Sequence, residues 1–321
     1  MSAATNIPST GPAAERSTDE GDGVAFALVD VFGEGPLTGN PLAVVDAGGH
    51  GAGEPPLEWL QAVAREFNQA ETTFVLPPTD ERAHQRLRSF TAGGVEVFGA
   101  GHNALGAWWW LLDSGRVAVP DDGVITQQIG TRLLEVTVDG DWLTMRQDSP
   151  RLGGKVAAET VAAAVGVDVD RLDPAVPPRV VGTGADHLVA GVDTSATLDA
   201  LAPGKAALRT LTADAGGQGL YLVVVGTERP VAAARARFFN PGAGLDEDPA
   251  TGSAAGPLAA YLGSLGLLDR DGLLAVHQGA SMQRPSTIHA AASDSDRVTV
   301  TGSAVRSAYG WLHPFDRPAD A

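Results

Sequence analysis

The chain has 321 residues, and its 39 acidic and 22 basic side chains give a formal net charge of −17. Such acidity disfavours nucleic acid and anionic membranes as partners and favours small-molecule chemistry. The absence of cysteine excludes disulfides, thiolate metal ligands and thiol nucleophiles. The seven histidines are not at ligand spacing, so we expect no metal site. No apolar stretch is long enough to span a bilayer and no signal-peptide pattern is present, which predicts a cytoplasmic protein.

Residues 1–22 are dominated by small and polar residues, and we expect a disordered tail there. The sequence that follows is typical of two strands, at 24–32 and at 39–45, with a Gly-Asn-Pro bend between them. Leu57–Phe67 carries apolar residues at helical spacing, and Asn68 is expected to end this helix. Further strands are expected at 72–76, 86–91 and 94–98.

Residues 86–93 and 235–242 match in pattern, which indicates an internal repeat. Each copy is followed by a glycine-containing loop and then by an apolar run, at 102–112 and at 253–262. Because these runs are apolar on every side, each is expected to form a helix enclosed by the rest of its domain. The sequence therefore predicts two related halves, each with strands wrapped around a buried central helix.

The predicted halves span residues 23–122 and 123–315, followed by a short loose tail at 316–321. We leave open whether the last strand returns to the first half. In the second half, strands are expected at 123–138, 142–147, 179–192, 220–225 and 298–305, and helices at 157–165 and 195–211.

The loop before the second central helix carries the clearest chemical signal. The first turn of a helix exposes unpaired amides, so the segment Thr251–Ala254 can bind an anion such as a substrate carboxylate. Asp248 lies just upstream, where it either caps the helix through the helix dipole or stands beside the bound anion. An N-cap role for Thr251–Ser253 is compatible with a grip on a ligand.

Two further polar residues lie at element boundaries. His102 begins the other central helix, where the helix N-terminus favours a neutral imidazole that can shuttle protons, although an isolated histidine is usually structural. Glu71 lies between a helix and a strand, and its position alone fits a solvated loop acid better than a catalytic group. The chain has no dinucleotide fingerprint, phosphate-binding loop or Gly-x-Ser-x-Gly motif.

Five segments occur in a fixed order: Gly39-Asn40-Pro41-Leu42-Ala43-Val44-Val45, Gln69-Ala70-Glu71-Thr72-Thr73-Phe74, Gly99-Ala100-Gly101-His102, Pro241-Gly242 with the run from Glu247 to Ala254, and Gln278-Gly279 with Arg284-Pro285-Ser286. Together they resemble the phenazine biosynthesis protein PhzF family. That family resembles diaminopimelate epimerase in fold. The resemblance implies an α+β protein of two pseudo-symmetric halves, each a curved, mostly antiparallel sheet around a central apolar helix, with the active site between them.

The resemblance also implies a chemistry. Racemases and epimerases of the wider superfamily use two cysteines, and here Ala100 and the segment Asp248-Pro249 occupy those places. Glu71 would instead be the main acid/base, assisted by Asp248 and His102. The implied substrate-binding residues are Asn40, Gly101, Thr251, Gly252 and Ser253.

The implied reaction isomerises trans-2,3-dihydro-3-hydroxyanthranilate in phenazine, and hence antibiotic, biosynthesis, without metal or organic cofactor, and the implied assembly is a homodimer. Asn103 and the bulky run Trp108–Trp110 depart from the family pattern, so another unsaturated cyclic amino acid stays open as substrate. One alternative is a racemase, epimerase or dehydratase that uses Glu71 with Asp248 or His102 in place of thiols. The other is a binding protein that kept the cleft and lost the chemistry.

Overall fold

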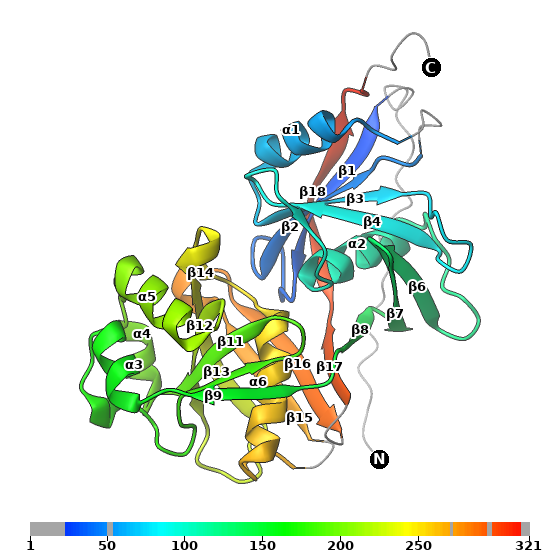
Figure 1. Ribbon diagram of the computed structural model, residues 1–321. Coiled ribbons are helices and arrows are strands. Elements are labelled where there is room, and N and C mark those ends of the chain that lie inside the picture. Colours follow the sequence, from blue (N-terminus) through cyan, green and yellow to red (C-terminus); the bar gives the residue numbers. More distant parts are fainter. Residues whose placement is uncertain (1–22, 50–53, 270–271, 294–296, 316–321) are drawn as a thin grey trace.

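The computed structural model describes residues 23–49, 54–269, 272–293 and 297–315 (Figure 1). This part of the chain contains six α-helices and 18 strands, which confirms the α+β class. The tails expected at 1–22 and 316–321 lie outside the described residues. Figure 1 shows two bodies of similar build, one around helix α2 and one around helix α6.

The first half surrounds α2 (His102–Asp113). Its strands are β1 (Val24–Val31), β2 (Asn40–Asp46), β3 (Glu71–Leu76), β4 (Gln85–Phe90), β5 (Glu96–Val97), β6 (Val124–Ile129), β7 (Arg132–Asp139), β8 (Trp142–Gln147) and β18 (Ala304–Leu312). Helix α1 (Leu57–Phe67) begins after Pro56 and ends at Asn68, as expected, in a left-handed conformation. Phe74 and Val75 are neighbours on β3 and face opposite sides, so Phe74 packs in the cluster of α1 and Val75 in that of α2.

The second half surrounds α6 (Gly252–Ser264). Its strands are β9 (Arg151–Lys155), β10 (Arg179–Gly182), β11 (Asp186–Gly191), β12 (Gly219–Val225), β13 (Ala233–Asn240), β14 (Leu245–Asp248), β15 (Leu273–Gln278), β16 (Ser286–Ser293) and β17 (Arg297–Gly302). Helices α3 (Ala158–Val165), α4 (Ser195–Ala200) and α5 (Lys205–Ala215) contribute to a separate apolar cluster with β11 and β12.

The two halves repeat one pairing scheme. In the first, β18, β1 and β2 pair antiparallel, β2 with β3 and β4 with β6 pair in parallel, and β6, β7 and β8 form an antiparallel meander. In the second, β9, β10 and β11 pair antiparallel, β11 with β12 and β13 with β15 pair in parallel, and β15, β16 and β17 form the meander. The halves also exchange strands, because β9 follows β8 but pairs in the second half and β18 follows β17 but pairs in the first. Strands β8 and β17 pair directly and join the halves.

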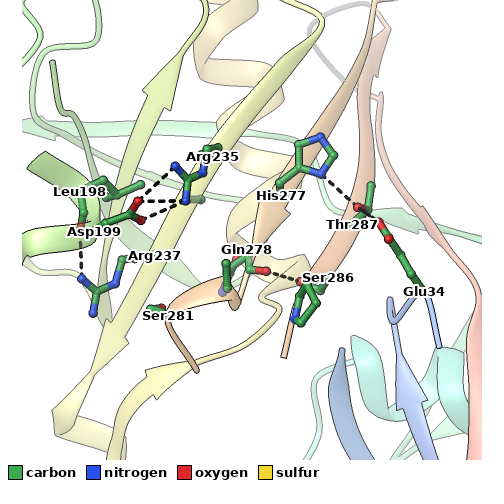
Figure 2. Close-up of a pocket in the computed structure, with 13 residues that line it drawn as sticks. Glu34, Leu198, Asp199, Arg235, Arg237, His277, Gln278, Ser281, Ser286 and Thr287 are labelled. Carbon is green, nitrogen blue, oxygen red and sulfur yellow. Dashed lines mark hydrogen bonds and ion pairs between the residues drawn. The ribbon is translucent and has the colours of Figure 1, made fainter. Parts of the chain in front are cut away.

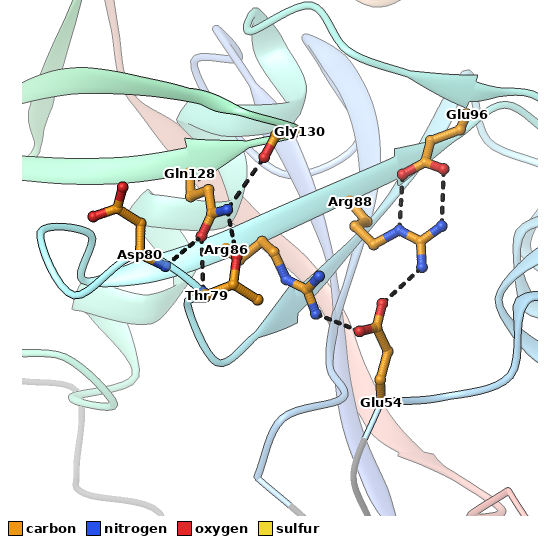
Figure 3. A network of polar contacts seen from close by, with 8 residues as sticks. All are labelled: Glu54, Thr79, Asp80, Arg86, Arg88, Glu96, Gln128 and Gly130. Atoms are coloured by element: carbon orange, nitrogen blue, oxygen red, sulfur yellow. Dashed lines mark hydrogen bonds and ion pairs between the residues drawn. The ribbon is translucent and has the colours of Figure 1, made fainter.

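The repeat extends to side chains. In the first half, Arg88 donates two hydrogen bonds of 2.8 Å to Glu96 (Figure 3). The Arg88 guanidinium also lies over the ring of Phe90. In the second, Arg237 donates bonds of 2.9 and 2.8 Å to Glu247 and lies over the ring of Phe239. The same ion pair therefore fixes the loop before each central helix.

Strand pairing differs from the expected division of the chain. Strands β6 and β7 were expected to open the second half, but α2 carries the chain back beside β4, where β6 pairs with it. The single strand expected at 298–305 is two strands, and β18 crosses to β1. We therefore propose a boundary after β8, near residue 147, with β18 as a returning strand of the first half.

The helix expected at 195–211 is interrupted. Its two parts, α4 and α5, are separated by residues 201–204, which include Pro203. Proline lacks an amide donor and disfavours helical geometry in the residue before it, so the helix stops there.

Both central helices are buried, as their all-round apolar sequences predict. Trp108 on α2 is fully buried, and its indole N–H donates a 2.9 Å hydrogen bond to Gln127. Gly106 on α2 allows close approach of the sheet, because an added Cβ would lie 2.6 Å from Val31 and 2.7 Å from Leu42. Helix α2 thus carries bulky tryptophans but approaches β1 and β2 closely at Gly106.

Candidate active site

Asp248 ends β14 in the second half and Asn40 begins β2 in the first. The Asn40 side-chain amide donates to Asp248 Oδ1 at 2.9 Å and to the Ala250 carbonyl at 2.8 Å. Asn40 and Asp248 are only 1 % and 8 % exposed. This contact crosses between the halves and places a carboxylate where they meet.

A chain of hydrogen-bonded, buried polar groups holds Asp248 in place. The Thr251 hydroxyl donates to Asp248 Oδ2 at 2.5 Å, and the Gln278 amide donates to Thr251 Oγ1 at 3.0 Å and to the Asp248 carbonyl at 2.7 Å. The hydroxyl of Tyr221 donates to Gln278 Oε1 at 3.0 Å. Burial raises the pKa of Tyr221, which keeps this donor protonated. The orientation of Asp248 is therefore determined by four side chains.

The role of Thr251 differs from the expected side-chain cap. Thr251 is the N-cap residue of α6, yet its side chain makes no capping hydrogen bond because the hydroxyl is committed to Asp248. Asp248 likewise makes no side-chain capping bond to the helix among the described hydrogen bonds. Thr251 therefore holds the N-cap position while its hydroxyl bonds Asp248, and a dipole effect of Asp248 on α6 stays a prediction.

Glu71 lies on the strand next to Asn40. It begins β3, and the parallel register with β2 places it opposite Leu42, two residues beyond Asn40. Its Oε2 atom is buried and has no hydrogen-bond partner among the described residues. Burial, followed by the nearby Asp248 carboxylate, raises the pKa of Glu71 to about 8. Glu71 and Asp248 therefore lie close together in an environment poor in water. This differs from the solvated loop that the sequence position of Glu71 alone favoured.

The two carboxyl groups have different proton affinities for a physical reason. Burial raises the pKa of Asp248 only to about 6, because the hydrogen bonds from Thr251 and Asn40 stabilise its charged form. Glu71 has no such donors among the described residues. At pH 7 the pair therefore holds mainly one negative charge, on Asp248, and one proton, on Glu71.

His102 is the first residue of α2 and belongs to the same set of buried, unpaired groups. Its Nε2 atom is buried without a partner in the described part of the chain. Burial lowers the pKa of His102 to about 4, so the ring is neutral at pH 7. Neutrality was expected from the helix N-terminus, but burial is the cause found here.

The amides at the two helix N-termini follow the same pattern. Gly101 is the N-cap of α2, and its amide donates to Asn103 Oδ1 at 2.7 Å, so the expected free amide is occupied. The amide of Thr251, the N-cap of α6, donates to Gln278 Oε1 at 3.4 Å. Among the hydrogen bonds of the described residues, none uses the amide of Gly252 or Ser253 at the start of α6. The Ser253 hydroxyl lies 3.2 Å from His187 Nε2, so the start of α6 adds a hydroxyl to its two free amides.

Tyr221, Gln278 and His187 were given no role by sequence reasoning. Gln278 stands in a motif that carried the family resemblance, but Tyr221 and His187 lie inside strongly apolar strands. The sequence marks these two residues only as polar side chains within apolar strands, and this pattern does not predict which residue each one bonds.

A separate pocket of about 90 Å³ is lined mainly by the second half, with Glu34 from the first half (Figure 2). Its charged walls are already paired, with Arg235 bonded to Asp199 at 2.9 Å and Arg237 bonded to the Leu198 carbonyl. Glu71, Asp248 and His102 do not line it. We therefore assign the candidate active site to the buried acid pair and not to this pocket.

The described residues contain no cluster of three or more His, Cys, Asp or Glu side chains placed to hold a metal ion. None of the helices found in them has the length and apolar character needed to cross a membrane.

Fold and site together define a class of protein: a two-halved α+β protein with an acid pair and two helix N-termini at the junction of its halves. The chain belongs to the phenazine biosynthesis-like protein family PhzC-PhzF, whose model matches residues 29–310. It is 32 % identical over 301 residues to the trans-2,3-dihydro-3-hydroxyanthranilate isomerase of Pseudomonas chlororaphis, covering 89 % of this chain and 98 % of that protein.

Solved structures agree with this assignment. A protein described as a predicted epimerase from Pseudomonas aeruginosa has a TM-score of 0.73 at 31 % identity, covering 90 % of this chain and 99 % of that one. A PhzF family protein from Bacillus anthracis shares the fold with a TM-score of 0.77 at 24 % identity, covering 90 % and 98 %. Relatives named as isomerases identify this chain as an isomerase of the PhzF type.

Proposed function

We propose that this isomerase shifts a proton and a double bond within a small, carboxylated, cyclic substrate such as trans-2,3-dihydro-3-hydroxyanthranilate, with Glu71 as acid/base. The observation that carries the proposal is Glu71 itself, whose buried Oε2 has no partner in the described residues and whose pKa is raised to about 8. A group with a pKa near the working pH can both accept and return a proton, which typically contributes ~10²–10⁴-fold to the rate.

The proton balance of the step is simple. Ionised Glu71 removes a proton from one ring carbon, the electron pair of that bond enters the ring as the double bond moves, and Glu71 returns the proton to another carbon. No electrons are gained or lost overall. Asp248, ionised at pH 7 and held by Asn40 and Thr251, would bind the substrate ammonium or hydroxyl group, and neutral His102 would assist proton transfer.

The substrate carboxylate would bind at the start of α6. The amides of Gly252 and Ser253 and the Ser253 hydroxyl supply donors there, and the helix dipole favours a negative charge. Gly101 would contribute only if its amide were released from Asn103 Oδ1, to which it donates at 2.7 Å. Exclusion of water between the halves would strengthen each of these interactions.

The test is proton NMR of the protein with trans-2,3-dihydro-3-hydroxyanthranilate in D₂O, beside Glu71→Gln. We expect the starting ring signals to be replaced by those of the isomer with wild type only, with deuterium in a ring carbon to the extent that Glu71 exchanges its proton with solvent before returning it. Deuterium at Cα without movement of the double bond would instead support the racemase or epimerase alternative. If wild type leaves the compound unchanged, this substrate is wrong, and other unsaturated cyclic amino acids follow in the same assay.

A cytoplasmic homodimer is part of the proposal. Tyr309 and Trp311 on β18 are 63 % and 42 % exposed and form an edge-to-face pair, which supports an apolar contact on that strand. Light scattering of the purified chain, with Trp311→Ser beside it, measures the assembly. A wild-type monomer would contradict the proposed dimer.

A further inference from the structure

His187 lies directly behind the N-terminus of α6. It is on β11, it is 2 % exposed, and its Nε2 atom is 3.2 Å from the hydroxyl oxygen of Ser253. The edge of the ring meets Phe238, with the ring centroids 4.9 Å apart and an interplanar angle of 88°. A histidine held in this way can reach the proposed carboxylate grip only through Ser253.

The other ring nitrogen limits the direction of that hydrogen bond. Nδ1 is buried and has no partner among the described residues. Burial lowers the pKa of His187 to about 4 against an opposing effect of Asp186, so the ring is neutral at pH 7 and carries one N–H. If Nδ1 held the hydrogen, a buried N–H would be left without an acceptor among the described residues, which is rare and destabilising.

The bound anion demands the same direction. A carboxylate only accepts hydrogen bonds, so Ser253 must donate its single hydroxyl hydrogen to the ligand. The bond between Ser253 and His187 must then run the other way, with Nε2–H as donor and the Ser253 oxygen as acceptor. The alternative tautomer would draw the Ser253 hydrogen toward the core and turn an oxygen lone pair toward the negative ligand.

We propose that His187 is a positioning residue that donates from Nε2 to the Ser253 oxygen and thereby points the Ser253 hydroxyl hydrogen at the carboxylate of the substrate. This inference rests on the proposed function, because it assumes that α6 binds a carboxylate. It adds that the grip is directional and that its direction is imposed by a residue that never touches the substrate.

A set of four variants tests the link through Ser253. Because the grip acts on the carboxylate before and during the reaction, its loss should raise KM and leave kcat nearly unchanged. We expect about a 10-fold rise in KM for His187→Leu and for Ser253→Ala, corresponding to one lost hydrogen bond to a charged group. The double variant should be no worse than Ser253→Ala. His187→Gln keeps an N–H near the Nε2 position and should restore most of the affinity.

A histidine that merely fills the core predicts a different pattern. His187→Leu would then act equally with and without the Ser253 hydroxyl, and His187→Gln would not rescue. Either result overturns the proposal. Far-ultraviolet circular dichroism and urea unfolding of each variant identify any that are simply unfolded, and for those the ring measurement below decides.

The second measurement needs no ligand. Nitrogen-15 NMR of the histidine rings in the full wild-type chain, assigned with His187→Gln, reports which nitrogen carries the hydrogen. We expect a neutral Nε2–H ring, and an Nδ1–H ring or an imidazolium at pH 7 would overturn the inference while the proposed function stands. Two results together would instead refute carboxylate binding at α6. They are that wild type does not convert trans-2,3-dihydro-3-hydroxyanthranilate, and that it binds anthranilate no more tightly than the uncharged carboxamide of anthranilate.

Discussion

The Asn40 side chain donates a 2.9 Å hydrogen bond to Asp248, a residue 208 positions away in the sequence. Asn40 belongs to the first half and Asp248 to the second, so the bond joins the two halves. Both side chains are buried, which makes the bond costly to leave unmade. The contact between the halves and the protonation state of Asp248 are therefore physically linked.

Replacing Asn40 should change the chemistry of Asp248. In Asn40→Ala the carboxylate loses a donor that stabilises its charge, so its pKa should rise above about 6. We expect about a 10-fold loss of kcat/KM at pH 7, with part of the loss recovered at higher pH, measured as a pH–rate profile. Gln128→Ala is the control, since this buried amide serves the loop of Thr79 and Asp80 (Figure 3). It should lower stability without moving the profile, and an identical shift in both variants would contradict the assignment.

The raised pKa of Glu71 predicts how activity depends on pH. As a base Glu71 must be ionised, so kcat/KM should rise with pH and level off above about 8. Stopped assays between pH 5.5 and 9.5 measure this rise of kcat/KM. In Glu71→Gln, kcat/KM should fall by at least ~10²-fold and should no longer rise with pH near 8. A flat profile in wild type would mean that Glu71 is not the titrating base.

The same group predicts the dependence of stability on pH. The pKa of Glu71 is raised from 4.5 to about 8 on folding, so its contribution is present below pH 4.5 and is lost as pH rises through 8. Glu71→Gln has no ionisable side chain at this position, so the variant does not lose this contribution to stability as the pH rises. Urea unfolding at pH 5 and pH 9 should therefore show the variant gaining free energy of unfolding relative to wild type at the higher pH. A difference between variant and wild type that is equal at both pH values would argue against a buried, protonated Glu71.

Two glycines on the central helices should respond oppositely to alanine. Gly106→Ala places a Cβ 2.6 Å from Val31 and 2.7 Å from Leu42, and overpacking of this kind typically costs about 1–3 kcal/mol. Gly263→Ala on α6 meets nothing within 4 Å and should gain roughly 0.5 kcal/mol from helix propensity. Thermal unfolding of both variants decides. Equal effects would mean that α2 does not pack as closely as described.

The repeated arginine pairs should differ in energy. Arg237 is 9 % exposed and depends on Glu247, so Glu247→Gln should cost about 2–4 kcal/mol by leaving a buried charge poorly compensated. Arg88 keeps Glu54 as a second partner at 3.0 Å, so Glu96→Gln should cost less than about 1 kcal/mol (Figure 3). Urea unfolding of each variant measures the difference. Equal costs would show that burial does not set the strength of these pairs.

The sequence was sufficient to predict the two halves, because the repeat around Arg86 and Arg235 and the two all-apolar helices are local patterns. It also predicted that Glu71, Asp248 and His102 would act together, but only through the family resemblance. Considered alone, Glu71 fitted a solvated loop acid. Within the described residues the structure shows instead a buried oxygen without a hydrogen-bond partner, on a strand that pairs with β2 and near Asp248 of the other half.

Local sequence determined where most helices and strands lie, since periodicity, proline and glycine act over a few residues, but it did not predict the division at β17 and β18. Tertiary structure decided that β18 pairs with β1 and that the Thr251 hydroxyl bonds Asp248 instead of capping its own helix. It also decided that His187 lies within hydrogen-bond distance of Ser253. It also decided which carboxyl group keeps its proton. These outcomes depend on contacts between segments far apart in the chain and on the loss of water that such contacts cause, and neither is encoded in the spacing of neighbouring residues.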